Sequence, residues 1–409
     1  MTVPLLSNWQ GINTDRKGRV VNRLGEKRPS WLVSLWGGLF NLIIYAIFGL
    51  VMWNFNRLTL YARLYPNGSL FARLERIALA LTVILLATSA VHELGHLLAG
   101  RLAGLRFHIL EIGPLRVTRE GGQLKIGWNR GMLFSGMAAS VPGEGVLSNL
   151  RGRMLAFALG GPLASLLMAI VAAVLFWWWQ GRLDLRTQAW MLETAAMTAI
   201  LSFVFFMTAM KPGRYQNGLS ADGDRIVSLI QGGPAATRWC ALVALNGTDL
   251  QGIRPKLWDE QLVHQAMMLQ DASYDTLTAR LMGYQWALDN GHIVQAAAWL
   301  DEALENWQTW SVGQHARLVL EKAYLLARFE KDAENGRFWY EKIPAHRLQT
   351  LWKFRAHAAI LLAEGNSSAA LQEIHTGLAR LASMPKTGTN IAEKNWLEEL
   401  KQIAETAVS

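Results

Sequence analysis

Residues 77–100, IALALTVILLATSAVHELGHLLAG, decide how this chain is organised. The stretch exceeds the roughly twenty apolar helical residues that cross a hydrocarbon core, which predicts a membrane-spanning helix. His92, Glu93 and His96 stand near its end, and polar side chains inside a span are costly unless a partner or a cavity receives them. The same segment therefore predicts a membrane helix with a polar site built into it.

The spacing of His92 and His96 places both imidazoles on one face of a helix, where they can bind the same zinc ion. Glu93 is the next residue along and can hold the proton of a metal-bound water. Zinc brings the pKa of such a water close to neutrality, and Glu93 can pass its proton to the leaving amine of a cleaved amide. The alternative is a pair of interfacial histidines that reach the headgroups without a metal.

Four stretches are long and apolar enough to cross the membrane. They are residues 31–53, 77–100, 154–179 and 189–210. Lys and Arg number fourteen in the N-terminal segment and the loop 101–153, against six in the two opposite loops. Because positive loops stay in the cytoplasm, we predict a multi-pass protein of the plasma (inner) membrane with both termini cytoplasmic.

The composition agrees with a membrane protein. Apolar residues make up 51% and charged residues 17% of the 409 residues, and the formal net charge is +9. Most of the excess Lys and Arg lies next to apolar segments, so we attribute it to membrane topology and predict no nucleic-acid partner. Cys240 is the single cysteine, which excludes an intramolecular disulfide framework and a zinc site of several cysteines.

The sequence predicts a mostly helical protein in three parts. They are a basic cytoplasmic segment (1–30), a polytopic helical membrane domain (31–232) and a soluble, solenoid-like helical domain (235–409). Residues 107–128 alternate apolar and polar side chains around Gly121 and Gly122, which indicates a small cytoplasmic β-hairpin.

An internal repeat marks the C-terminal part. Small and apolar residues recur with identical spacing at Gly291, Ala296, Leu300 and Ala303, and at Gly365, Ala370, Ile374 and Gly377. Small residues in the turn and at helical spacing let paired helices pack closely, as in a helical solenoid. The middle copy, near Lys331 to Tyr340, fits the template poorly, so a degenerate tetratricopeptide-like array and a generic helical bundle both stay open.

A catalytic zinc needs a third protein ligand and an open position. The predicted topology brings Asp222 to the same membrane face as His92 and His96, which makes Asp222 the candidate. The rivals are Asp224, Glu111, Glu144 and His108. The alternative for Asp222 is an ordinary aspartate of a turn or helix start.

The third predicted span contains Gly160-Gly161-Pro162. Pro and Gly inside a spanning helix free backbone groups that protein or water must satisfy, so we expect this break to border the site. A packing kink is the alternative.

Three motifs together resemble the site-2 proteases, a family of intramembrane zinc metalloproteases. They are His-Glu-Leu-Gly-His at 92–96, Gly-Gly-Pro-Leu-Ala-Ser at 160–165, and Asp222-Gly223. The resemblance implies that His92, His96 and Asp222 bind Zn²⁺ and that Glu93 is the catalytic residue. It also implies that the substrates are membrane-spanning helices, cut in or near the bilayer in regulated proteolysis.

The chain departs from the family pattern in several places. Ser165 stands where family members commonly have an asparagine that is thought to engage substrate backbone, and the usual proline-rich approach to a Leu-Asp-Gly-Gly motif is missing before Asp222. The loops between the spans leave no room for a PDZ domain. We therefore expect the C-terminal helices to recruit the substrate or another protein partner. Removal of the chain beyond about Gly233 should then abolish cleavage of a native substrate and spare zinc binding.

Two other functions compete with an endopeptidase. A non-enzymatic membrane adaptor would use the spans as an anchor and the C-terminal helices for docking, but a dead protease should have lost Glu93 or a histidine. A metal transporter or sensor would need further intramembrane acids or histidines to form a path. The sequence therefore favours the enzyme.

Overall fold

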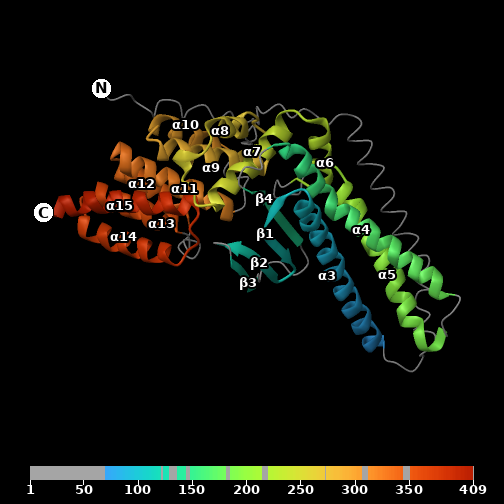
Figure 1. Cartoon of the computed structure of the whole chain (residues 1–409). Coiled ribbons are helices and arrows are strands. Elements are labelled where there is room, and N and C mark those ends of the chain that lie inside the picture. Colours follow the sequence, from blue (N-terminus) through green and yellow to red (C-terminus); the bar gives the residue numbers. More distant parts are fainter. Residues whose placement is uncertain are drawn as a thin grey trace, which may run out of the picture.

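A computed structural model describes most of the chain, and its helices flank one small sheet (Figure 1). The described residues are 70–120, 123–128, 136–143, 148–180, 185–213, 220–271, 273–305, 312–343 and 351–408. The predicted basic segment (1–30) and the first predicted span (31–53) lie outside them.

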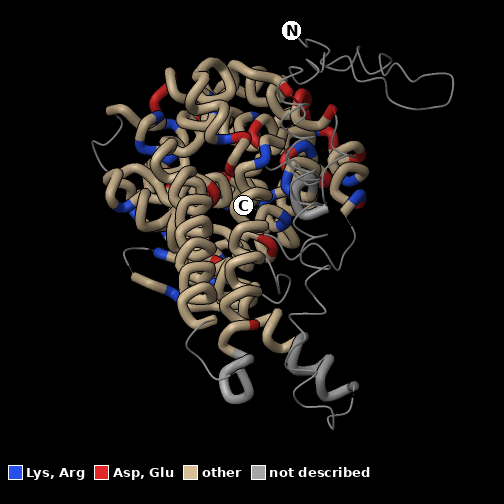
Figure 2. Tube along the Cα trace, turned by 90° about the vertical axis from the view of Figure 1, so that its right-hand side faces the viewer, with Lys and Arg blue, Asp and Glu red and all other residues tan. Residues whose placement is uncertain are grey.

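Three long helices pack into an elongated bundle (Figure 1). They are α3 (Leu70–Leu102), α4 (Leu150–Gln180) and α5 (Leu185–Met210). Each contains a stretch long and apolar enough to cross a membrane, namely Ala78–Leu102, Leu150–Gln180 and Met191–Met210. These stretches correspond to the predicted spans at 77–100, 154–179 and 189–210. Charged residues are rare along the bundle and gather where it meets the rest of the molecule (Figure 2).

Gly95 of α3 and Gly160 of α4 let these two helices meet backbone to backbone. A Cβ atom on Gly160 would lie 2.4 Å from the carbonyl oxygen of Gly95 and 2.6 Å from Cβ of Ala99. Such distances are too short for any side chain, and small residues at a contact are typical of packed membrane helices. The same two helices also carry exposed apolar side chains, such as Leu98 (64% exposed) and Leu167 (62% exposed), which suits contact with lipid.

A four-stranded antiparallel sheet follows α3. Its strands are β1 (Leu105–Ile112), β2 (Leu115–Glu120), β3 (Gln123–Trp128) and β4 (Gly136–Pro142), in the order β3-β2-β1-β4. β2 and β3 form a hairpin with Thr118 opposite Lys125, within the predicted range. The prediction of only a hairpin was wrong, because the sheet has four strands. The sequence of β4, GMAASVP, lacks the regular alternation of apolar and polar residues that marks a strand, and β4 pairs with β1 across an intervening hairpin.

A short helix, α6 (Asp222–Gln231), leads from the bundle to a C-terminal helical region, which we define as α7 to α15. Its helices are α7 (Pro234–Leu250), η1 (Pro255–Leu257), α8 (Glu260–Met267), α9 (Tyr274–Asp289), α10 (Ile293–Leu304), α11 (Val312–Leu325), η3 (Leu326–Glu330), α12 (Ala333–Glu341), α13 (Trp352–Ala363), α14 (Ser367–Ala382) and α15 (Gly388–Val408). Successive helices in this region pack against each other.

The repeated glycines lie in turns between paired helices. Gly291 joins α9 to α10 with φ of +76°, and Gly365 joins α13 to α14 with φ of +81°. Lys331 holds the same place between η3 and α12 with φ of +59°, and Gly336 follows it at the spacing at which Ala296 follows Gly291. The middle copy therefore forms the same kind of helix pair, although Lys replaces Gly at the turn.

A buried polar chain links alternate helices of this region. The Tyr284 hydroxyl (α9) donates to Glu321 (α11) at 2.7 Å, and Arg355 (α13) donates to Glu321 at 2.7 Å and to Glu393 (α15) at 2.9 Å. The Arg355, Glu321 and Glu393 side chains are each only 1% exposed. Buried charges need such partners, so these contacts fix how α9, α11, α13 and α15 align.

Substitution of Gly160 should open the contact between α3 and α4. A methyl group there meets the Gly95 carbonyl, so we expect Gly160→Ala to lower the free energy of unfolding by about 1–3 kcal/mol, the usual cost of overpacking. Unfolding of the purified protein in detergent measures this change. Gly127→Ala is the matched control, because a Cβ atom at Gly127 has no neighbour within 4 Å. Equal stability of the two variants would contradict the prediction.

Candidate metal centre

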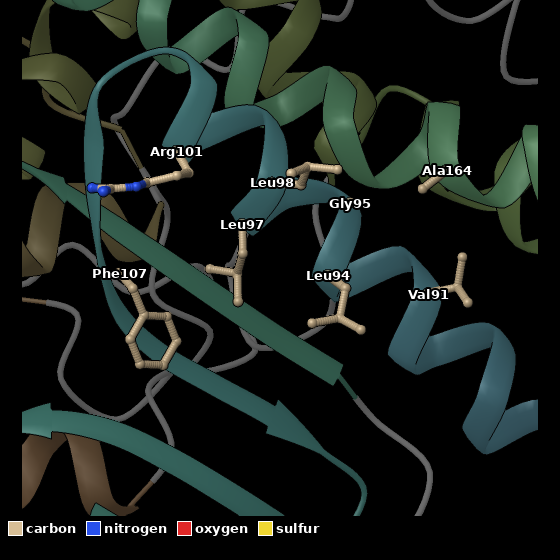
Figure 3. Close-up of a pocket in the computed structure, with 8 residues that line it drawn as sticks. All are labelled: Val91, Leu94, Gly95, Leu97, Leu98, Arg101, Phe107 and Ala164. Carbon is tan, nitrogen blue, oxygen red and sulfur yellow. The ribbon is translucent and has the colours of Figure 1, made fainter. Parts of the chain in front are cut away.

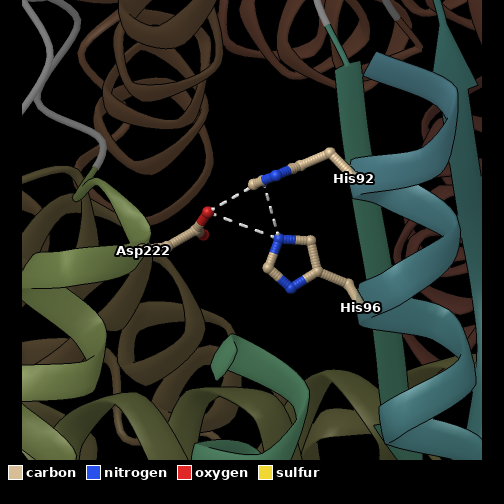
Figure 4. Close-up of side chains that lie close together, drawn as sticks. All are labelled: His92, His96 and Asp222. Atoms are coloured by element: carbon tan, nitrogen blue, oxygen red, sulfur yellow. Dashed lines mark hydrogen bonds and ion pairs between the residues drawn. The ribbon is translucent and has the colours of Figure 1, made fainter. Parts of the chain in front are cut away.

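Two imidazoles from α3 and one carboxylate from α6 converge on a single point (Figure 4). Nε2 of His92 lies 3.1 Å from Oδ2 of Asp222, and Nε2 of His96 lies 3.3 Å from the same oxygen. The two Nε2 atoms are 3.2 Å apart. Both histidines are buried, whereas the Asp222 side chain is 29% exposed. The three residues are the predicted pair and the predicted third partner, brought together from positions far apart in sequence.

The shape of this triangle suits a zinc ion. Ligand atoms about 2.1 Å from a tetrahedral zinc lie roughly 3.4 Å from one another. The observed edges of 3.1, 3.3 and 3.2 Å are close to that value and nearly equal. Three protein ligands also leave the fourth tetrahedral position open, as a catalytic metal requires. The donor set of two imidazoles and one carboxylate therefore fits the metal that the sequence predicts.

Helix α4 holds both imidazoles from behind. Nδ1 of His96 lies 2.7 Å from the carbonyl oxygen of Phe157, and Nδ1 of His92 lies 2.9 Å from the hydroxyl of Ser165. Because a carbonyl oxygen can only accept, the proton of neutral His96 is assigned to Nδ1 and its Nε2 lone pair faces Asp222. Such outer hydrogen bonds fix the orientation and tautomer of metal-binding histidines.

The Gly-Gly-Pro motif of α4 forms the surface that receives His96. A Cβ atom on Gly161 would lie 2.2 Å from Nε2 of His96, so the ring occupies the space that a side chain would fill. Pro162 lies inside the helix and cannot donate the hydrogen bond of an ordinary helical residue. The motif therefore borders the site, as predicted, and its first glycine also makes the contact with α3.

Asp222 is the first residue of α6, and local contacts fix its backbone. The amide of Ala221 donates to the carbonyl of Gly213 at 3.0 Å, and a Cβ atom on Gly223 would lie 2.2 Å from the carbonyl oxygen of Met210. Burial by itself raises the pKa of the Asp222 carboxyl, but the adjacent His92 and His96 side chains outweigh it and hold the pKa well below its ordinary value. The carboxylate is therefore ionised at neutral pH, which is the form that binds a metal.

Glu93 lies against the first residues of β4. Its side chain is buried, and a Cβ atom on Gly136 would lie 2.3 Å from Oε1 of Glu93. The carboxylate also takes a hydrogen bond from the backbone of Ala138. The edge strand β4 thus holds Glu93 next to the three converging side chains, and Glu93 is not itself part of that cluster.

The rival ligands lie elsewhere. Among the described residues, the cluster of candidate ligands comprises His92, His96 and Asp222. Glu111 is buried and pairs with Arg116 at 3.2 Å, and neither Asp224 nor His108 joins the cluster. Glu144 lies outside the described residues.

An apolar pocket of about 530 Å³ lies on the other face of α3 (Figure 3). Leu94, Leu97 and Phe107 line it together with Ala164 of α4, and neither histidine contributes. Arg101 is the charged residue of a lining that is otherwise apolar, and the lining contains none of the candidate metal ligands, so the pocket is separate from the metal centre.

Sequence reasoning missed the contacts that support the site. It considered Ser165 only for substrate handling and did not predict that the hydroxyl contacts His92. The position of Ser165, one turn beyond Gly161 on the same helix, was a usable signal. The contact with the Phe157 carbonyl could not be found from the sequence, because every residue type has the same backbone carbonyl.

Comparison with known proteins gives one match. A family model described as peptidase family M50 matches residues 80–312, which is more than half of the chain and includes the histidines, Ser165 and Asp222. Searches of curated proteins and of solved structures return no match.

Loss of the Ser165 hydroxyl should weaken metal binding. Ser165→Ala leaves Nδ1 of His92 without its partner, and loss of such an outer hydrogen bond typically costs about 10- to 100-fold in metal affinity. Competition with a chromophoric chelator in detergent measures the dissociation constant for Zn²⁺. Ser202→Ala is the control, since Ser202 is a fully buried serine of α5 that contacts Thr88 instead. The role given to Ser165 is wrong if both variants bind zinc as tightly as the unaltered protein.

Proposed function

Because the chain belongs to peptidase family M50, we propose that it is a zinc-dependent intramembrane endopeptidase that cleaves membrane-spanning helices in or near the bilayer. Family membership makes the chain a metalloprotease and bears out the resemblance to the site-2 proteases. Three helices among the described residues are long and apolar enough to cross a membrane, which together with the family supports an integral membrane protein. The observation that carries the proposal is the triangle of ligand atoms from His92, His96 and Asp222 at the end of a spanning helix.

Each residue has a part in the proposed reaction. His92, His96 and Asp222 hold the ion, and Ser165 and the Phe157 carbonyl orient the two imidazoles. Bound zinc supplies a Lewis acid that polarises the scissile carbonyl and acidifies water. Glu93 takes the proton of the attacking water and gives it to the leaving amine. Its burial against β4 keeps the carboxylate in one place for both transfers.

The substrate must present an extended backbone to this site. The carbonyl groups of an intact helix are already hydrogen-bonded, so a spanning substrate unwinds locally before cleavage. β4 is an edge strand, and its first residue lies against Glu93. An unwound segment beside Glu93 therefore lies next to a strand edge, where extended peptides are commonly received.

The proposed location of the site is the cytoplasmic end of the bundle in the plasma (inner) membrane, with both termini cytoplasmic. The charge bias of the loops supports this orientation. Charged residues gather at the same end of the bundle in Figure 2, where water for hydrolysis can enter. Cleavage there would release the cytoplasmic part of an anchored protein, which suits regulated proteolysis.

The C-terminal helical region is proposed to dock a protein, either the substrate or a partner. Three consecutive helix pairs repeat the same turn position, at Gly291, Lys331 and Gly365. Stacked pairs of this kind form a solenoid-like array with an extended binding surface. An adaptor without activity would also use such a surface, but it would not need the ligand triangle.

Three substitutions test the proposed roles. Glu93→Ala should lower the cleavage rate of a membrane-helix substrate at least about 100-fold, the usual contribution of a general acid/base, and should retain bound zinc. His96→Ala and Asp222→Ala should lose both zinc and activity, because each removes a ligand. Zinc content by elemental analysis and cleavage in detergent or liposomes measure the two properties.

Asp224→Ala is the matched control for Asp222→Ala and should keep both properties. Loss of zinc in Asp224→Ala with retention in Asp222→Ala would move the ligand by two residues. A purified wild-type protein without stoichiometric metal would reject the proposed zinc enzyme.

A further inference from the structure

The third ligand stands on a helix that cannot hold its own position. α6 has ten residues, and isolated helices of this length are only marginally stable in water. Its N-cap residue, Ala221, provides no side-chain hydrogen bond to the first turn. Tertiary contacts must therefore set the place of Asp222 relative to the two histidines.

The C-terminal helical region makes a paired polar contact close to Asp222. Arg225, three residues after Asp222 on α6, binds Asp275 in the first turn of α9 through both terminal nitrogens of its guanidinium, Nη1 and Nη2. The second of these bonds, from Nη2 to Oδ1, is 2.7 Å long. Both side chains are largely buried, at 14% and 8% exposure, so the paired geometry counts for more than that of a surface ion pair.

A second helix of the region confines the same arginine. The Arg225 guanidinium lies 4.6 Å from the ring centroid of Trp239 in α7, and Nη2 of Arg238 approaches Asp275 at 3.8 Å. Arg238 is itself fixed by Asp271 at 2.9 Å. Arg225 is therefore enclosed by α7 and α9, one helical turn from the ligand.

The other polar anchor of α6 acts at its far end. Arg151 of α4 donates to the carbonyl oxygens of Leu229 and Ile230, at 2.5 and 2.7 Å. These carbonyls lie seven and eight residues beyond Asp222, about 10–12 Å along the helix axis. Arg151 thus fixes where α6 ends, whereas Arg225 is the side chain that ties the turn carrying the ligand to the C-terminal helical region, in addition to the backbone contacts of Ala221 and Gly223.

We propose that Arg225 and Asp275 are positioning residues of the metal centre, through which the C-terminal helical region holds Asp222 in ligand geometry. This inference rests on the proposed function, in which Asp222 binds zinc. It reverses the expectation that loss of the chain beyond about Gly233 spares metal binding. It also links the C-terminal helical region to the metal centre, because a bound partner that displaces α9 would displace Arg225.

The test measures zinc affinity of the full-length protein in detergent for Arg225→Gln and Asp275→Asn. We expect the dissociation constant to rise about 10- to 100-fold in both, as for other outer contacts of metal ligands. Arg225→Gln is decisive. It removes a positive charge near a cation site, so a purely electrostatic effect would tighten binding, whereas misplacement of Asp222 weakens it. Arg225→Lys should give an intermediate value, because it keeps one charged contact.

Asp289→Asn is the matched control within the same region. Asp289 pairs with Arg254 at 2.5 Å and is buried, yet neither residue contacts α6. It should lose stability without a change in zinc affinity beyond about twofold. Absorption of the Co²⁺-substituted protein adds a direct view of ligand geometry, which should change in Arg225→Gln and not in Asp289→Asn.

Hydrogen exchange of the amides of residues 222–228, without added metal, separates this inference from the proposed function. We expect faster exchange in Arg225→Gln and Asp275→Asn than in Asp289→Asn. Unchanged exchange and unchanged affinity in the first two variants would overturn the inference while leaving a zinc enzyme. A wild-type protein that binds no metal would overturn the proposed function, and hydrogen exchange would still decide whether the ion pair holds α6.

Discussion

Polar ligand atoms at the end of an apolar helix are the constraint on which the rest of the structure depends. Imidazole and carboxylate groups are costly in a membrane segment unless other polar groups receive them. Here Nε2 of His92, Nε2 of His96 and Oδ2 of Asp222 lie close together, where one metal ion could bind all three. The Nδ1 atoms of both rings form hydrogen bonds with α4. The close helix contact, the sheet against Glu93 and the short helix α6 all serve to bring these few atoms together.

Helix α4 is the element that ties the ligand helices to each other. Besides its contacts with both imidazoles, its first turn holds the ends of α3 and α6. Arg153 donates to the carbonyl of Ala103, just after α3, and Arg151 donates to the last carbonyls of α6. A cation at a helix C-terminus satisfies free carbonyls and opposes the helix dipole. One helix thus sets the separation between the two ligand-bearing elements.

The parts that sequence predicts well are those whose geometry is local. The i, i+4 spacing of His92 and His96 sets their common face wherever the helix lies, and apolar length alone locates the three helices of the described residues that are long enough to cross a membrane. Charge bias placed Asp222 and its rival Asp224 on the same membrane side as the histidines, and the resemblance to the site-2 proteases favoured Asp222. Contacts set by tertiary packing were not reachable: the Phe157 carbonyl, the Gly136 contact with Glu93, and the Arg225–Asp275 pair. β4 was missed because its small residues carry no periodic signal.

The glycine contact between α3 and α4 also determines how a membrane-embedded substrate can reach the metal centre. With the backbones at Gly95 and Gly160 in contact, these two helices form a closed seam across which no polypeptide can slide in from the lipid. The imidazoles of His92 and His96 lie against α4 beside that seam, and their Nε2 atoms face Asp222 of α6. For the proposed protease, a substrate therefore cannot reach the metal centre between α3 and α4 at the level of these two glycines, and the lack of two side chains closes that route.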